Sequence, residues 1–135
     1  MATVTLIEYA DASPEVKAVF DDIKRTRNVP VVNNFWKALA SHPETLKRTW
    51  ETLREVMRPG ALDPLMKEMI YIAVSVANNC DYCIHSHTAA ARAKGMTDAQ
   101  YQELLAVIGM ASQTNAFSTA LKVPVDPQFL VGSKE

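Results

Sequence analysis

Apolar residues recur at helical spacing along most of this chain, and no window shows the alternation of apolar and polar residues that a half-buried strand needs. Ser13 and Pro14 are typical of a helix start, with an N-cap followed by a first-turn proline. The pattern predicts a helix from that point, a short helix over residues 33–40, and a third that begins at Pro43 and stops before Pro59.

The apolar content of residues 64–77 is almost unbroken. Asp63 and Pro64 provide the start of a predicted helix here, and nearly every residue after Lys67 and Glu68 is apolar. A helix that is apolar on every side is buried, either at the centre of a fold or at a subunit contact. We therefore expect this helix to be central or to lie in an interface.

The remaining helices have clear boundary residues. The helix after the two cysteines is expected to end at Gly95, since glycine is typical of the position that follows a helix C-cap. Thr97 then begins another helix, with Gln100 in the capping-box position. We expect a separate last helix over residues 110–121.

These elements predict an all-α protein, a compact bundle of six or seven helices. The chain contains four glycines, and no repeat, low-complexity tract or linker divides it. A length of 135 residues fits one domain and allows a core to be buried. We expect a single domain over residues 1–135, with a core at about 13–121 and a C-terminal tail at 122–135.

Composition and charge argue against several function classes. The formal net charge of -1 gives no broad attraction to nucleic acid or to an anionic membrane, so we expect neither partner. The N-terminal segment lacks the basic start and long apolar stretch of a signal peptide. No apolar run is expected to approach the roughly 20 residues that span a bilayer. These features indicate a cytoplasmic protein, in which a lasting disulfide is unusual.

The segment NNCDYCIHSHT contains both cysteines and two of the three histidines. Haem attachment needs a histidine directly after the second cysteine, and Ile84 stands there, so this interpretation fails. Zinc binding by Cys80, Cys83 and His87 stays open, but structural zinc sites usually draw ligand pairs from separated segments, and no second pair exists here. A structural disulfide and a redox-active thiol pair are the other interpretations.

The thiol interpretation has a physical basis. Asn79 and Asp81 flank Cys80 and suit the beginning of a helix. The free N–H groups and positive dipole end of such a helix lower the pKa of a cysteine, and the thiolate is the reactive form. His87 lies four residues after Cys83 on the same helical face, where an imidazole can take the thiol proton directly or through water. We therefore expect Cys83 to be the lower-pKa thiol.

Two further polar residues are candidates. Glu68 lies one turn inside the predicted helix over residues 64–77. Its carboxylate is either stabilised by the helix N-terminus or buried, where it would orient His87 and pass its proton on. His85 does not share the face of Cys83 and His87, and we expect it on the helix surface or in an interface.

Four of these residues resemble the signature of the alkylhydroperoxidase D-like (AhpD-like) family, also called the carboxymuconolactone decarboxylase family: Glu68, Cys80, Cys83 and His87. The resemblance is strongest over residues 63–95 and covers about 15–121. It implies an all-α protein that assembles into trimers or hexamers. It also implies a thiol-dependent peroxidase that reduces small hydroperoxides.

The resemblance assigns a role to each residue. Cys83 would be the peroxidatic cysteine, which becomes a sulfenic acid, and Cys80 would be the resolving cysteine that condenses with it to a disulfide. His87 would be the base for Cys83, with Glu68 as its proton partner. We expect no bound cofactor and no metal. The expected reductant is an external dithiol donor, a lipoyl-bearing or thioredoxin-like protein.

One position departs from the family pattern. The well-characterised peroxidases have a histidine directly before the second cysteine, where this chain has Tyr82. A phenol can donate a hydrogen bond but is no base at neutral pH, so Tyr82 and His85 are expected in supporting roles. Two other functions compete with peroxide reduction. One is the family's decarboxylase activity on a lactone acid, which needs no cysteine pair, and the other is a non-catalytic oligomeric redox sensor.

Overall fold

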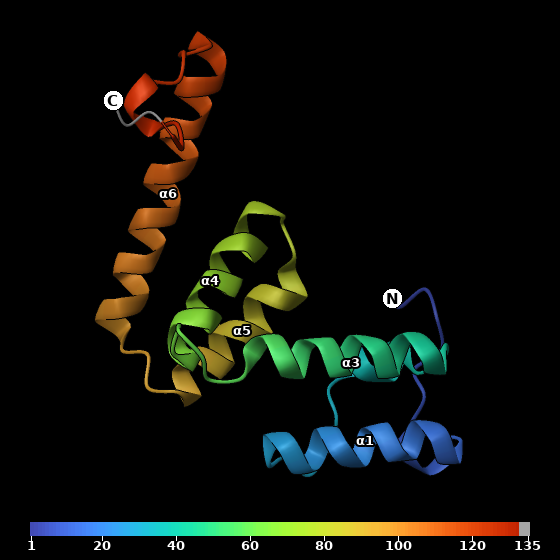
Figure 1. The fold of residues 1–135 in the computed structure, drawn as a ribbon. Helices are drawn as coiled ribbons and strands as arrows, with labels where there is room; N and C mark the ends of the chain where they lie inside the picture. Colours follow the sequence, from blue (N-terminus) through green and yellow to red (C-terminus); the bar gives the residue numbers. More distant parts are fainter. Residues whose placement is uncertain (133–135) are drawn as a thin grey trace. The chain divides into compact units, whose positions relative to one another are not determined.

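The computed structural model describes residues 1–132, and all regular structure within them is helical (Figure 1). Six α-helices and two short 3₁₀ helices follow one another in this range, which confirms the all-α fold class. The elements are η1 Tyr9–Asp11, α1 Pro14–Arg27, α2 Asn34–Leu39, α3 Pro43–Met57, α4 Pro64–Ala77, α5 Asp81–Ala93, α6 Asp98–Leu121 and η2 Pro127–Phe129.

The contacts of the chain divide it into two compact units, Met1–Arg58 and Pro59–Glu135. Each unit has a hydrophobic core of its own. The N-terminal unit contains α1, α2 and α3, whereas α4, α5 and α6 belong to the C-terminal unit. The single domain expected over residues 1–135 therefore stays a prediction. All the site residues predicted from the sequence lie in the C-terminal unit.

Two tryptophans occupy the core of the N-terminal unit. Both α1 and α2 pack on α3, and Trp36 of α2 meets Trp50 of α3 edge to face, with ring centroids 5.5 Å apart. Asp22 on α1 accepts hydrogen bonds from Trp50 Nε1 at 2.7 Å and from Arg54 Nη1 at 2.6 Å. The predicted start of α1 is confirmed, because the Ser13 side chain caps this helix. This unit is therefore held together by its apolar core and by the hydrogen bonds that Asp22 accepts at the edge of that core.

The C-terminal unit is built on a hairpin of α4 and α5, and α6 packs against α4 (Figure 1). Along α4 the buried residues are Glu68, Ile72 and Ser75, which places one carboxylate on the buried face of the helix. The core contains Ile72, Ala91 and Met96, and partly buried apolar side chains pack around them: Leu65, Met69, Val76, Tyr101 and Leu104. The buried face of α4 is thus the side that carries the candidate site.

A tight turn joins α4 to α5 and determines where the first cysteine lies. Asn79 has a left-handed φ of 55°, and its amide donates to the carbonyl of Val76 at 3.1 Å. The Cys80 amide donates to the carbonyl of Ser75 at 2.9 Å. These are the two hydrogen bonds of a Schellman motif, which ends a helix by satisfying its last carbonyls. Cys80 completes this motif and is also the N-cap of α5.

The end of α5 repeats this arrangement. Gly95 has a φ of 98°, and the amides of Gly95 and Met96 donate to the carbonyls of Arg92 and Ala91, both at 3.0 Å. Glycine is favoured at this left-handed position because it has no Cβ to clash. The predicted helix end at Gly95 is confirmed, and Lys94 is the C-cap of α5.

α6 is longer than the sequence pattern predicted. Thr97 and Gln100 form the expected capping box. The helix then runs unbroken to Leu121, so the separate helix predicted over residues 110–121 is wrong. Gly109 does not interrupt the helix, because a glycine in a helix interior costs only about 1 kcal/mol and no proline follows it before the end.

The length of α6 also corrects the expectation about apolar runs. With 24 residues it is long and apolar enough to cross a membrane by length and composition alone. One helix of this kind is weak evidence for a membrane span, so the absence of a membrane partner stays a prediction. The tail that follows contains η2, and the predicted tail residues 133–135 lie outside the described residues.

Candidate active site

The two cysteines lie in the first turn of α5 and are both free thiols. Cys80 is the N-cap residue, and its Sγ accepts a hydrogen bond from the backbone amide of Cys83 at 3.3 Å. Both side chains are partly buried. The hairpin turn and the capping bond therefore hold the two sulfurs one helical turn apart, at the N-terminal end of α5.

The second part of the site is a histidine that contacts a buried carboxylate. His87 Nδ1 on α5 is 2.7 Å from Glu68 Oε2 on α4. Only 6% of Glu68 is exposed, so it is not a surface carboxylate at a helix N-terminus. Of the two interpretations of Glu68, the structure supports the buried carboxylate that orients His87.

The charge of Glu68 decides which nitrogen of His87 is free. Burial alone would raise the pKa of Glu68, but hydrogen bonds from His87 and Lys94 and the charge of Lys94 bring the pKa below its ordinary value. The ionised carboxylate can only accept, so the Nδ1–H of His87 must donate to it. The neutral imidazole then keeps its lone pair on Nε2, and this nitrogen can accept a proton.

Two contacts of this pair were not predicted. The ring of Tyr71 stacks on that of His87, with centroids 3.6 Å apart and an interplanar angle of 19°. Lys94 Nζ lies 3.2 Å from Glu68 Oε1. Helical spacing carries a signal for both, because Tyr71 is three residues after Glu68 on α4 and Lys94 is seven residues after His87.

The environment of Cys83 corrects the expectation about its acidity. Burial and the neighbouring sulfur of Cys80 raise the pKa of Cys83 to about 11, so it is not a thiol with a lowered pKa. The helix start does not reverse this effect, since the Cys83 amide is already bonded to Cys80 Sγ. The turn before Cys83 and the packing around it determine the direction in which its pKa shifts. Neither of them is apparent from residue spacing.

The two residues expected in supporting roles lie on the exposed surface of α5. The His85 side chain is 80% exposed, and its Nε2 lies 3.6 Å from Oδ1 of Asp81, one turn earlier on the helix surface. Tyr82 is also exposed. The surface position expected for His85 is confirmed. Within residues 1–132, no three histidine, cysteine, aspartate or glutamate side chains are grouped closely enough to hold a metal ion.

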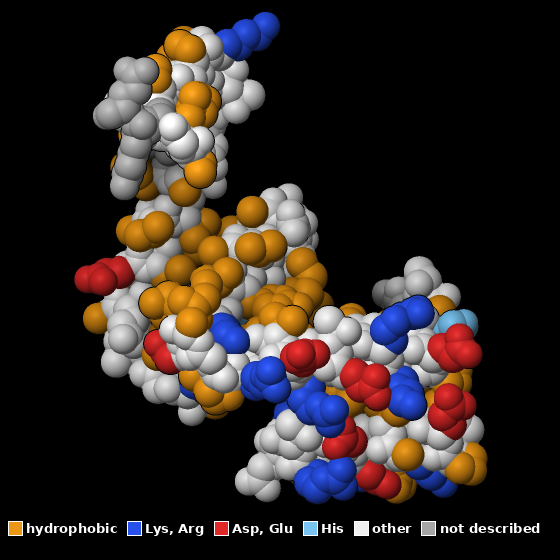
Figure 2. Space-filling model, in the orientation of Figure 1, with side chains coloured by type: hydrophobic (Ala, Val, Ile, Leu, Met, Phe, Trp, Pro, Cys, Tyr) orange, Lys and Arg blue, Asp and Glu red, His pale blue; other side chains and the backbone are white. Residues whose placement is uncertain are grey.

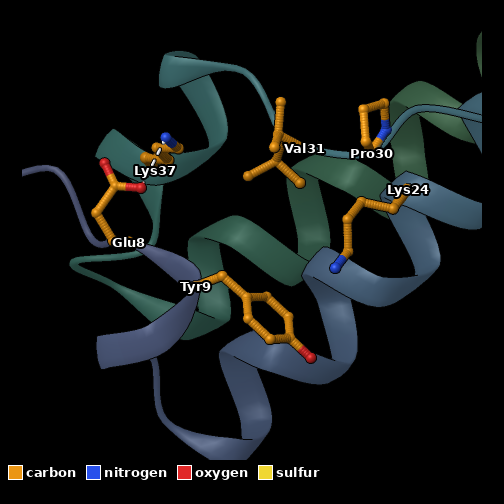
Figure 3. A pocket seen from close by; sticks show the side chains of 7 residues that line it. Glu8, Tyr9, Lys24, Pro30, Val31 and Lys37 are labelled. Carbon is orange, nitrogen blue, oxygen red and sulfur yellow. Dashed lines mark hydrogen bonds and ion pairs between the residues drawn. The ribbon is translucent and has the colours of Figure 1, made fainter.

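A pocket in the N-terminal unit is a weaker candidate. Its volume is about 170 Å³, and Lys24 and Lys37 are among its lining residues (Figure 3). Lys37 Nζ is paired with Glu8 at 2.8 Å, and Lys24 Nζ lies 4.0 Å from the ring centroid of Tyr9. Lys24 also pairs with a carboxylate one turn away on α1. Both ammonium groups are thus engaged, and the pocket has no reactive side chain.

Comparison with known proteins shows the family of the chain. The model of the carboxymuconolactone decarboxylase family matches residues 43–126, which is well over half of the chain. This span includes all four residues of the signature.

Two curated relatives are named alkyl hydroperoxide reductase AhpD. The one from Solibacter usitatus is 28% identical over 107 residues, which cover 77% of this chain and 59% of that protein. The one from Azorhizobium caulinodans is 31% identical over 115 residues, covering 78% of this chain and 60% of that protein. The chain thus spans about three fifths of the length of these relatives.

A solved structure extends the similarity to nearly the whole chain. The crystal structure of the alkylhydroperoxidase AhpD core from Rhodospirillum rubrum is 63% identical to this chain and matches it with a TM-score of 0.94. The match covers 97% of this chain and 98% of that one. The chain therefore belongs to the carboxymuconolactone decarboxylase family and has the fold of its AhpD-like members.

Proposed function

We propose that this protein reduces small hydroperoxides through its cysteine pair, at the expense of an external dithiol. One observation supports this most directly: two free thiols share the first turn of α5, and an imidazole anchored by a buried carboxylate lies one turn further along the same helix. The names of the two curated relatives and of the crystal structure support the same reaction class.

The reaction begins at Cys83. Its thiolate attacks one oxygen of the hydroperoxide, the O–O bond breaks, and the other oxygen leaves as an alkoxide that takes up a proton. Cys83 is oxidised to a sulfenic acid, and the peroxide is reduced to an alcohol. Cys80 then attacks this sulfur, a disulfide forms and water leaves. A dithiol donor, lipoyl-bearing or thioredoxin-like, reduces the disulfide by thiol exchange.

The high pKa of Cys83 makes a base necessary. A thiol whose pKa is raised to about 11 is almost entirely protonated at pH 7. His87 is four residues away on the same helix and has Nε2 available to accept the thiol proton. Glu68 then stabilises the imidazolium through its bond to Nδ1. In this scheme His87 removes the proton from the weakly acidic Cys83 thiol and so produces the reactive thiolate.

Assembly and location complete the proposal. The apolar residues exposed on α4 and α6 suit a homo-oligomer, a trimer or hexamer. A cytoplasmic location would supply the reducing partners that the cycle needs. Hydroperoxide, dithiol donor and subunit copies are then the partners of the protein.

The test is peroxide consumption with several dithiol donors, with each cysteine replaced in turn. Cys83→Ser should abolish both turnover and the sulfenic acid. Cys80→Ser should stop turnover but still give a trappable sulfenic acid on Cys83 after one equivalent of peroxide. The wild-type chain should lose two hydrogens within one peptide on mild oxidation. A sulfenic acid on Cys80 in Cys83→Ser, and none on Cys83 in Cys80→Ser, would reverse the two roles.

The two histidines of α5 provide a matched comparison. His87→Ala should slow sulfenic acid formation by about 10²-fold or more, because the proton acceptor is lost. His85→Ala removes an exposed imidazole two residues earlier and should slow the step far less. Equal rates in the two variants would contradict the role of His87.

A decarboxylase is the second candidate, and one observation favours it. The pair of Glu68 and His87 is complete without either thiol, so it could move a proton on a lactone acid alone. In that case Cys83→Ser would keep its activity on the lactone acid, and wild-type protein would not consume peroxide. A protein that forms the disulfide readily but does not turn over would instead be a redox sensor.

A further inference from the structure

Lys94 lies beside the buried carboxylate of the site. Its Nζ is 3.2 Å from Glu68 Oε1, while His87 Nδ1 is 2.7 Å from Glu68 Oε2, so each carboxylate oxygen has one partner. The backbone of Lys94 is held at the C-cap of α5, with Gly95 in the left-handed conformation after it. The helix dipole favours a cation at this end, but it does not require a contact with a carboxylate on another helix.

The burial of the pair makes the charge of Lys94 important. The Glu68 side chain is 7% exposed and that of His87 is 14% exposed, so solvent screens their contact with each other weakly. The Lys94 side chain is 41% exposed, so solvent screens its charge in part. Among the hydrogen-bond partners of Glu68 within residues 1–132, Lys94 is the ammonium group. Among the described residues, α4 also brings Tyr71 onto the His87 ring, and α5 carries Cys80 and Cys83. Arg92 of α5 lies over the ring of Tyr101 of α6.

A nearby positive charge lowers the pKa of the groups around it, because it disfavours their protonated forms. The charge of Glu68 has the opposite effect and tends to hold a proton on His87. Glu68 and His87 are coupled and share the proton between them. Without Lys94, this pair would lose its proton only at a higher pH. A His87 that already carries both ring protons cannot accept one from a thiol.

We propose that Lys94 is a positioning residue that offsets the charge of Glu68 and so keeps His87 able to accept a proton at neutral pH. This inference rests on the proposed function, because the proton in question is that of Cys83. Lys94 itself does not touch the reacting sulfur in this scheme. It acts through the carboxylate.

Four substitutions separate the effect of the Lys94 charge from the effect of its packing. Lys94→Gln removes the charge but keeps a hydrogen-bond donor near Glu68, and Lys94→Arg keeps the charge. Lys122→Gln is the matched control, since Lys122 is the C-cap of α6 and is not a partner of Glu68. Lys94→Met serves as the second charge-removing variant if Lys94→Gln fails to fold by circular dichroism.

The first measurement is the ring titration of His87 by ¹H–¹⁵N NMR, with His42 and His85 as internal references. In Lys94→Gln the midpoint of His87 should move up by several tenths to about one pH unit. Lys94→Arg should restore the wild-type midpoint, and Lys122→Gln should leave it unchanged. An unchanged midpoint in folded Lys94→Gln overturns the proposal, and so does a shift that Lys94→Arg does not reverse.

The second measurement is the pH dependence of Cys83 alkylation by iodoacetamide, in a Cys80→Ser background. Lys94→Gln should lower the rate at pH 6.5 about three- to tenfold and change the rate at pH 9 far less. A rate that falls by the same factor at both pH values would contradict the proposal. The ring titration involves no peroxide, so the two proposals can fail separately. If wild-type protein does not reduce peroxide but the midpoint still shifts in Lys94→Gln, only the peroxidase proposal fails.

Discussion

At the scale of single residues, one buried carboxylate organises the site. Glu68 has a hydrogen bond from an imidazole on one oxygen and from an ammonium group on the other. A buried carboxylate without such partners would take up a proton, whereas these partners stabilise the ionised form. The same contacts that orient His87 therefore also stabilise the fold.

Glu68→Gln should reveal this contribution as a dependence of stability on pH. Because the folded-state pKa of Glu68 is lowered, its contribution is present above the ordinary value of 4.5 and is lost as pH falls through the folded-state pKa. At pH 7 the variant should unfold at lower urea, with a loss of about 1–3 kcal/mol in the free energy of unfolding.

The difference in stability between wild type and Glu68→Gln should then narrow as pH falls from 7 through the folded-state pKa of Glu68, because the wild-type carboxylate then takes up a proton too. Glu103→Gln on the exposed side of α6 is the control and should change stability by less than about 0.5 kcal/mol at any pH in this range. A Glu68→Gln deficit that stays constant over this pH range would contradict the assignment.

At the scale of elements, the turn between α4 and α5 holds the thiols in place. The Schellman motif needs a left-handed residue, and Asn79 supplies it with a φ of 55°. Cys80 follows directly and caps α5. The backbone conformation of one residue therefore controls the position of the Cys80 thiol.

Asn79→Ala should lower the free energy of unfolding by about 1 kcal/mol, because a Cβ without a compensating side-chain contact disfavours the left-handed region. Asn79→Gly should be close to wild type, since glycine adopts this conformation without strain. The neighbouring Asn78→Ala is the matched control, because Asn78 has a φ of -90° and is also exposed. Urea unfolding of the three variants checks this order, and an equal loss in Asn78→Ala would contradict it.

At the scale of the whole molecule, α4 and α6 leave large apolar side chains exposed within residues 1–132, and such surfaces predict assembly. α6 buries none of its residues. Figure 2 shows apolar side chains gathered over the helices of the C-terminal unit, and charged ones of both signs over those of the N-terminal unit. On α6 the exposed apolar residues include four at heptad spacing, which is typical of helix pairing: Val107, Met110, Phe117 and Leu121.

We expect a symmetric homo-oligomer, a trimer or hexamer, with α6 or the exposed face of α4 at the contact. Met110→Glu combined with Phe117→Glu should dissociate it, because two buried charges cannot be accommodated in an apolar interface. Gln113→Glu adds one charge between them at a polar position and is the control. Light scattering at micromolar concentration measures the mass. A monomer in wild-type protein would contradict the prediction.

The helix boundaries could be predicted because their causes are local. Ser13, Gly95 and Thr97 act through bonds to residues within one turn, and such bonds depend on sequence neighbours alone. The continuity of α6 was missed because glycine weakens a helix without ending it. Whether the helix continues past Gly109 depends on the free energy of helix formation summed over all of α6, and not on this one residue.

The sequence alone determined the helical fold class, the helix starts and the identity of the four residues that resemble a family signature. Only the tertiary structure decided that Glu68 is buried against His87, 19 residues away along the chain. It also decided the pKa of Cys83, and it brought Lys94 to the carboxylate. The physical reason is that hydrogen bonds within a turn follow from sequence, whereas burial and charge depend on which side chains other helices place nearby.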